Sequence, residues 1–422
     1  MVTGTTATWA ISGLATAGVI VRPANWPEAV WALAGAAALL IFGLIPPDAA
    51  FAGVVKGLDV YLFLTGMMLL AEVARREGLF DWLARIAIST AKGSPTRLFG
   101  LIYGVGIVVT ALLSNDATAV VLTPAVLAAT KAARVKNPVP YVLICAFIAN
   151  AASFVLPISN PANLVVFGGG HMPPLGVWIG RFLAPSVAAI AITYVALFLT
   201  QRRSLACERI EQVIETEKLS SAGKMAAAGI AATAIVLVSA SALDVALGAP
   251  SAVLGVLTAG AALAVRRETP WTFIREISWG VLPLVAGLFV LVEALSRTGA
   301  VAALADILGQ ASAASPQGSA WGAGVVVAFA CNLVNNLPAG LLAGAALQSA
   351  HVSPDIAAAT LIGVDLGPNL SVTGSLATIL WLTALRRDNV SVSAWQFFKL
   401  GLAVMTPALF GALAAALWFS SP

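Results

Sequence analysis

Long runs of apolar residues make up most of this 422-residue chain, and its charged residues gather in the stretches between those runs. Hydrophobic residues account for 59% of the sequence and charged residues for only 10%, and the mean hydropathy is +0.94. A soluble domain carries about 25% charged residues. The chain is therefore predicted to be an all-α polytopic membrane protein, with membrane lipid as its surroundings.

Composition also narrows the classes of function. The basic residues lie between apolar runs, a pattern that sets membrane orientation and does not indicate a nucleic-acid partner. The cysteines Cys145, Cys207 and Cys331 are far apart and lack CxxC spacing, so neither a disulfide framework nor a metal site is expected. The sequence displays no nucleophile–base pair and no cofactor motif. A transporter is predicted rather than an enzyme.

A polar segment, residues 114–118 (SNDAT), lies between two apolar arms, 98–113 and 119–130. Each arm is shorter than the roughly 20 helical residues that cross a hydrocarbon core. This pattern predicts a re-entrant hairpin over 98–133, a backbone tolerated at membrane depth only where it is buried in protein or lines a cavity. Placing Asp116 there costs about 2.5–3.5 kcal/mol, so we expect it to serve a substrate or a proton.

The two halves of the chain share spacings that indicate an internal repeat. Gly66-x5-Glu72-x5-Gly78 recurs 221 residues later, and the same offset places Ser114-Asn115 on Asn335-Asn336. An offset of 215, after a change in loop length, places Asn150 on Asp365. We therefore predict two inverted-topology repeats, each with five spans, a re-entrant hairpin and a broken helix.

The predicted boundaries follow from this repeat. The first transmembrane repeat covers residues 1–200, with its hairpin at 98–133 and its broken helix at 140–168. A charged connector, 201–224, joins it to the second repeat, 225–422, with its hairpin at 319–350 and its broken helix at 356–385. Residues 79–88 are amphipathic and suited to lying in the membrane interface.

The basic residues orient this arrangement. Of the 23 Lys and Arg residues, only Lys56, Arg181 and Arg297 fall on the side opposite the 201–224 connector. By the positive-inside rule the connector is cytoplasmic and both termini face outward. The first hairpin then enters from the cytoplasm and the second from outside.

Four polar segments interrupt the predicted spans: 114–118, 157–163, 332–338 and 365–378. Pro157 and Pro161 remove two backbone donors and should unwind their helix. Freed carbonyls and nearby polar side chains can bind an ion or a polar solute. A single such segment is equally well explained as a structural kink, but four segments paired by a repeat favour a shared binding site near the membrane midplane.

Two further intramembrane acids are assigned a structural role. Glu72 and Glu293 lie near the ends of their spans, close in sequence to Arg75 and Arg297 respectively. We expect ion pairs that support the scaffold.

The polar segments resemble those of the bacterial arsenite efflux permeases of the ion-transporter superfamily. The matching stretches are 113–118 (LSNDAT), 122–124 (LTP), 335–338 (NNLP), 363–369 (GVDLGPN) and 374–381 (GSLATILW). The resemblance implies a bacterial inner-membrane antiporter that exports trivalent arsenic and antimony hydroxides in exchange for protons. Some members work with a cytoplasmic arsenite-stimulated ATPase, and the sequence leaves open whether this chain does.

A neutral trihydroxide suits a site built from amides, hydroxyls and free carbonyls. The residues expected to bind it are Asn115, Ser159, Asn160, Asn163, Asn335, Asn336, Ser375 and Thr378. Asp116 is expected to alternate between protonated and ionised states, with Asp365 as a second titrating group or a structural acceptor.

Departures from the family pattern keep alternatives open. Asn150 stands where better-known members have an acid, and residues 159–163 (SNPAN) also occur in silicic acid exporters. A silicic acid exporter, or a sodium-coupled carboxylate or sodium/proton transporter, are therefore alternatives on the same fold. A passive channel is a further alternative, which uphill transport would exclude.

Overall fold

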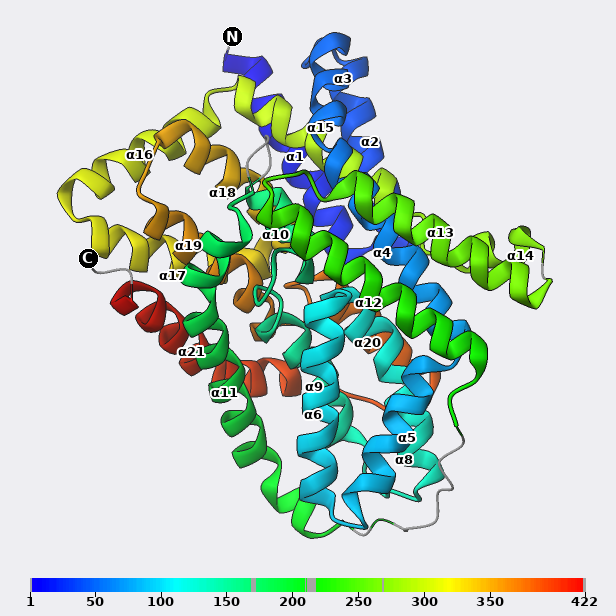
Figure 1. The fold of residues 1–422 in the computed structure, drawn as a ribbon. Coiled ribbons are helices and arrows are strands. Elements are labelled where there is room, and N and C mark those ends of the chain that lie inside the picture. The colour runs from blue at the N-terminus through cyan, green and yellow to red at the C-terminus, as the bar shows by residue number, and fades with distance from the viewer. Residues whose placement is uncertain (1, 168–171, 209, 211–217, 268, 420–422) are drawn as a thin grey trace.

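The computed structural model describes residues 2–167, 172–208, 210, 218–267 and 269–419. The described residues form helices and connecting loops without a strand, which confirms the predicted all-α class. Within these described ranges, seven helices are long and apolar enough to cross a membrane, or up to nine if each of two bent pairs counts as one span. Figure 1 shows two bodies of helices that meet along the middle of the molecule.

One body, which we call the scaffold group, combines helices from the first half of the chain with helices from the second half. It consists of α1 (Val2–Val21), α2 (Glu28–Ile41), α3 (Pro47–Lys56), α4 (Leu58–Arg76), α12 (Ser221–Ala242), α13 (Gly248–Arg266), α14 (Pro270–Glu276) and α15 (Val281–Arg297). Helix α4 packs along α13, and α2 packs along α15. Each half of the chain therefore completes its packing against the other half.

Glycines let α4 and α13 approach closely. A Cβ on Gly66 would lie 2.2 Å from the carbonyl oxygen of Ser251, and a Cβ on Gly255 would lie 2.6 Å from the carbonyl oxygen of Gly66. Small residues at such crossings permit the backbone contact that holds helices together in lipid. The recurring glycine at position 66 thus has a packing role.

The second body, the hairpin group, contains all four predicted polar segments. Its first part is α5 (Leu79–Ala91), α6 (Pro95–Leu112), α7 (Asn115–Ala117), a π-helical turn (Thr118–Leu122), α8 (Thr123–Ala132), α9 (Val139–Ala151), a 3₁₀ turn (Pro157–Ser159), α10 (Pro161–Val166) and α11 (Leu175–Ala206). Its second part is α16 (Ala300–Ala314), α17 (Pro316–Val334), α18 (Asn336–Ala350), α19 (Pro354–Leu366), a 3₁₀ turn (Gly367–Leu370), α20 (Leu376–Arg387) and α21 (Ala394–Phe419). The long helices α11 and α21 pack side by side at one edge (Figure 1).

The order of elements is the same in the two halves. Helices α3 and α4 meet at a bend of 46°, and α14 and α15 meet at a bend of 47°. Helix α5 packs on the first hairpin, and α16 packs on the second. The short helices α3, α14 and α16 were absent from the sequence prediction because each lacks the length of a span.

The incoming arm of each hairpin is longer than predicted. Helix α6 begins at Pro95 with Ser94 as its N-cap, and α17 begins at Pro316 with Ser315 as its N-cap. With 18 and 19 residues, both are long enough to cross a membrane, so the expectation that the incoming arm of the first hairpin is too short to span was wrong. The outgoing arm contains α8, which has 10 residues and remains short. The error arose because the arms were counted from the first uninterrupted apolar residue, whereas a cap and a proline start each helix earlier.

Helix α5 extends the predicted amphipathic segment to Ala91. Its apolar residues, among them Phe80, Ala84 and Ile88, are buried against the neighbouring helices α6 and α8 rather than left free for lipid. The amphipathic pattern was read correctly as a helix with one apolar face. The surface that covers this face is protein, because the hairpin lies beside it.

The two predicted acidic supports form ion pairs. Glu72 accepts hydrogen bonds from Arg75 and Arg76, and Glu293 pairs with Arg297 at 3.5 Å. Each cluster also recruits a residue from the other half: Glu276 of α14 binds Arg75 and Arg76, and Lys56 of α3 binds Glu293 at 2.6 Å. The first helix of each bent pair is thereby fastened to the other half of the chain.

Candidate functional site

The first hairpin breaks at Ser114, which has an extended backbone (φ −175°, ψ 165°). Its Oγ accepts a hydrogen bond of 3.2 Å from the backbone N–H of Ala117, and Asn115 Oδ1 accepts one of 2.9 Å from the N–H of Asp116. Side chains of this kind satisfy N–H groups that have no partner at the start of a helix. The polar segment therefore ends one helix and begins the next.

A π-helical turn, Thr118–Leu122, follows this break. Pro124 lacks an N–H and its ring crowds the preceding turn, which accounts for the wider winding just before it. Thr110 on the incoming arm and Thr118 on the outgoing arm share a buried hydrogen bond of 2.8 Å between their hydroxyls. That bond holds the two arms together at the apex.

Asp116 is partly exposed, and its carboxylate makes no hydrogen bond or ion pair with any described residue. It lies in the first turn of α7, where the positive end of the helix dipole favours a negative charge. A partly exposed carboxylate without a partner among the described residues differs from a structural carboxylate, which would be bonded within the protein.

The second break lies between α9 and α10. Asn160 has an extended backbone and its Oδ1 caps α10 by accepting from Ala162 N–H at 3.0 Å. Ser159 Oγ donates to the carbonyl of Ala111 at 3.0 Å and accepts from Leu156 N–H at 3.2 Å. The break is therefore tied directly to the last turn of α6 beside the first hairpin apex.

The second hairpin breaks at Asn335, whose backbone (φ 71°, ψ 153°) lies in a region that favours glycine. Its Oδ1 accepts from Leu337 N–H at 3.3 Å, which caps α18. The N–H of Asn336 donates to the carbonyl of Gly374 at 2.9 Å. This bond ties the second hairpin to the fourth polar segment.

The fourth break, between α19 and α20, is capped by Ser375, whose Oγ accepts from Thr378 N–H at 3.1 Å. The hydroxyls of Ser375 and Thr378 also share a hydrogen bond of 2.9 Å. Helix α20 packs against α7 and the π-helical turn of the first hairpin. The fourth break therefore contacts the first, and all four polar segments gather in one region.

Two side-chain bonds join the broken helices of the two halves. Asn160 Nδ2 donates to Asp365 Oδ1 at 2.7 Å, and Asn150 Nδ2 donates to Asn369 Oδ1 at 2.9 Å. All four residues are buried. Three acceptor oxygens here have no donor among the described residues: Asn150 Oδ1, Asn163 Oδ1 and Asp365 Oδ2.

The predicted binding residues differ in how much hydrogen-bonding capacity they have left. Ser159 and Asn160 use theirs within the protein, and Asn163 Nδ2 donates to the carbonyl of Ser153 at 3.0 Å. The side-chain amide of Asn336 and the Nδ2 group of Asn115 make no hydrogen bond with a described residue. Among the described residues predicted to bind, these two amides and Asn163 Oδ1 therefore keep hydrogen-bonding capacity for a solute.

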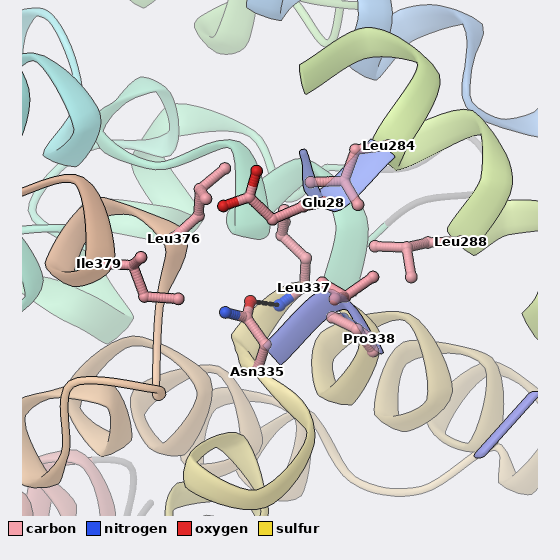
Figure 2. Close-up of a pocket in the computed structure, with 9 residues that line it drawn as sticks. Glu28, Leu284, Leu288, Asn335, Leu337, Pro338, Leu376 and Ile379 are labelled. Atoms are coloured by element: carbon pink, nitrogen blue, oxygen red, sulfur yellow. Dashed lines mark hydrogen bonds between the residues drawn. The ribbon is translucent and has the colours of Figure 1, made fainter. Parts of the chain in front are cut away.

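A small pocket lies between the scaffold group and the second hairpin (Figure 2). Its polar lining consists of Glu28 from α2 and Asn335, and its apolar lining includes Leu337 and Leu376. Glu28 is held by an ion pair of 3.1 Å with Arg22 Nε. Sequence reasoning missed Glu28, because a lone acid at the start of a span carries no signal of what it faces.

The electrostatics of the site are set by acids and helix ends. The four polar segments contain Asp116 and Asp365 but no Lys or Arg. Helices α18 and α20 each begin at the site, so their positive dipole ends are directed at it. The arrangement offers donors and carbonyl acceptors to a small polar solute and a carboxylate to a cation or proton.

Residues 16–364 match the sequence profile of a family described as citrate transporters (CitMHS). The arsenical pump membrane protein of Yersinia enterocolitica is 28% identical over 364 residues, and that of Escherichia coli K12 is 27% identical over 366 residues; each alignment covers 83% of both chains. An uncharacterised transporter of Mycobacterium bovis is 27% identical over 406 residues, 92% of both chains.

Two solved structures have a similar fold. The YdaH transporter of Alcanivorax borkumensis superposes with a TM-score of 0.55 at 14% identity, covering 89% of this chain and 90% of that one. The efflux pump MtrF of Neisseria gonorrhoeae superposes with a TM-score of 0.50 at 12% identity, covering 88% and 83%. Both likenesses extend over most of the chain and concern its fold.

Proposed function

Because the chain belongs to the citrate transporter (CitMHS) family, and is therefore a membrane transporter rather than an enzyme, we propose that it exports arsenite and antimonite as trihydroxides in exchange for protons. The observation that carries the proposal is the gathering of four helix breaks around uncharged amides, hydroxyls and two carboxylates. The names of the arsenical pump relatives support the choice of solute.

The chemistry of the solute fits these groups. Near neutral pH the trihydroxide of trivalent arsenic is uncharged and carries three hydroxyls that both donate and accept hydrogen bonds. Asn115 and Asn336 hold the amides with spare capacity, and Thr378 and Ser375 supply hydroxyls beside them. Ser159, Asn160, Asn163 and Asn335 hold the breaks open and direct backbone groups toward the solute.

Asp116 is the proposed carrier of the coupling proton. Protonation from outside neutralises it and permits the return movement of the empty site. Ionisation toward the cytoplasm releases the proton and favours binding of the trihydroxide. Asp365 accepts from Asn160 on one oxygen and has no donor among the described residues on the other, and it is a second titrating group or a fixed acceptor.

The membrane arrangement follows the charge distribution. The proposed inverted repeats are residues 1–200 and 225–422. The 201–224 connector lies in the cytoplasm, and both termini lie on the opposite, outer side of the inner membrane. The similar bends of 46° and 47° and the shared order of elements support the repeat. A cytoplasmic arsenite-stimulated ATPase is a further partner to test.

A second candidate function is sodium-coupled transport of a carboxylate. The three buried oxygens that lack a donor among the described residues are the type of ligand that hard cations prefer. The family is also described as citrate transporters. Helix N-termini at the site also favour an anion. The absence of Lys and Arg from all four polar segments argues against a polyanionic solute.

Everted membrane vesicles separate these functions. With an imposed pH gradient, acidic inside, we expect arsenite to accumulate and a protonophore to abolish the accumulation. Vesicles from cells without the protein are the control. Failure to accumulate arsenite, together with sodium-dependent movement of citrate, would keep the transporter fold and replace the proposed solute.

A further inference from the structure

A cavity of about 490 Å³ lies apart from the four breaks, between the scaffold group and the end of α10. Residues at the junction of α3 and α4, at the end of α12 and in the loop before α13 form most of its wall, and Leu164 and Phe167 close the side that faces the hairpin group. Cavities of roughly 300–1,000 Å³ hold small solutes. This cavity has the size of a place that a solute occupies or passes.

A serine in its wall has a buried hydroxyl without a partner among the described residues. Ser241 is 4% exposed, lines the cavity, and its Oγ makes no hydrogen bond with any described residue. Buried Ser251, by contrast, donates to the carbonyl of Phe63 at 3.2 Å. Buried polar atoms are almost always bonded, so the unbonded hydroxyl of Ser241 is an exception beside the cavity.

The charge in the wall is negative. Asp59 uses one oxygen to accept from Gly248 N–H at 2.8 Å, which caps α13, and Asp244 makes no hydrogen bond or ion pair with a described residue. Lys56 also lines the cavity, but Glu293 neutralises its ammonium group at 2.6 Å. The described wall of the cavity therefore contains two carboxylates and no unpaired cation.

The cavity lies close to the candidate site. Helix α10 has six residues and is about 9 Å long, with Asn160 at its start in the second break and Phe167 just beyond its end at the cavity. The small pocket is lined by other residues, among them Glu28 and Asn335. Glu28 pairs with Arg22, one of the basic residues assigned to the same side as the connector. Each pocket is lined by residues of both the scaffold group and the hairpin group.

We propose that this cavity is the external vestibule of the transport path, where uncharged hydroxylated solutes leave and cations enter while anions are repelled. The identity of the solute rests on the proposed function, and the external placement rests on the orientation inferred from the basic residues. Negatively lined clefts concentrate cations and exclude anions through their local potential. The vestibule thereby selects by charge before a solute meets the four breaks.

Reaction of an introduced thiol tests the proposal without depending on transport. The background variant is Cys207→Ser, since Cys207 is exposed whereas Cys145 and Cys331 are buried. Ser241→Cys is labelled in intact cells with impermeant thiosulfonates of similar size, one cationic and one anionic. Ala246→Cys, at a second position of the wall, serves if Ser241→Cys fails to fold. The control is Gln317→Cys, at an exposed position near the start of α17 on the proposed external side.

The measured quantity is the labelling rate with the cationic reagent divided by the rate with the anionic reagent. We expect this ratio to be about tenfold higher at position 241 than at position 317. Asp244→Asn should reduce that preference, and labelling at position 241 should slow arsenite export. Equal preference at the two positions would overturn the charge selection. Labelling of Gln317→Cys but not of either wall cysteine from outside would overturn the vestibule. If the unmodified protein moves no arsenite, the proposal that arsenite is the solute is rejected. The labelling ratio still tests whether the cavity is an external vestibule.

Discussion

Asn160 donates a hydrogen bond of 2.7 Å to Asp365, and both side chains are buried. Asn160 begins α10 in the first half of the chain, and Asp365 lies in the last turn of α19 in the second half. The same asparagine caps its own helix through Oδ1. One side chain therefore fixes the local break and its position relative to the other broken helix.

Removing this bond is expected to destabilise the protein. Asn160→Ala leaves Asp365 Oδ1 buried without a donor, a loss of about 1–3 kcal/mol. Since the two residues share one bond, the effects of Asn160→Ala and Asp365→Ala should be non-additive by a similar amount. Melting temperatures in detergent measure both effects, with exposed Gln317→Ala as the control. Strict additivity in the double variant would contradict the pairing.

Asp116→Asn is expected to abolish proton-coupled accumulation of arsenite in everted vesicles while leaving the protein folded. The amide has nearly the shape of the carboxyl group but cannot release a proton, so uphill exchange loses its driving reaction. Downhill movement of arsenite should persist. Exposed Asp306→Asn removes a carboxylate far from the breaks and should transport normally. Full proton-driven accumulation by Asp116→Asn would remove Asp116 from the proposed coupling role.

Much of the hairpin group was predictable because its breaks depend on local chemistry. Proline at positions 157, 161 and 338 and short polar side chains at 114, 160, 335 and 375 act within a few residues of themselves. Their effect on the backbone can therefore be predicted from the adjacent residues. The structure places a helix break or a helix start at each of these positions.

Long-range partners could not be predicted from the sequence. Nothing near Asn150 indicates that its partner is Asn369, and nothing near Glu28 indicates that it faces Asn335. Such pairs depend on how the two halves pack, which helical periodicity does not specify. The ends of the hairpin arms were missed for a different reason, because apolar runs locate a helix more reliably than its caps do.

The two ion-pair clusters of the scaffold group should differ in their contribution to stability. The Glu72 side chain is 8% exposed and binds two guanidinium groups, so Glu72→Gln is expected to cost about 3 kcal/mol. The Lys56 side chain is 61% exposed, and Lys56→Gln is expected to cost about 0–1 kcal/mol. Thermal unfolding in detergent at low and high salt compares them. If Lys56→Gln lost more stability than Glu72→Gln, burial would not determine which ion-pair cluster contributes more.

Substitution of Asn335 separates backbone conformation from side-chain function. Its φ of 71° and ψ of 153° suit glycine, and holding a residue with a side chain there costs about 1–3 kcal/mol. Asn335→Gly loses the cap but relieves that cost, whereas Asn335→Ala loses the cap and keeps it. We therefore expect the glycine variant to melt at a higher temperature than the alanine variant. Asn389→Gly and Asn389→Ala, at an exposed position with φ of 59°, provide the matched pair away from the site.

The same two variants test the role of the amide in transport. Both variants remove the amide, which donates to the Thr373 carbonyl. If both lose arsenite export, the Asn335 side chain contributes either to binding of the solute or to the attachment of the hairpin at that carbonyl. A loss seen only in the alanine variant reports the backbone at the apex. Normal export and unchanged melting in both variants would mean that the second hairpin needs neither the conformation nor the amide at this position.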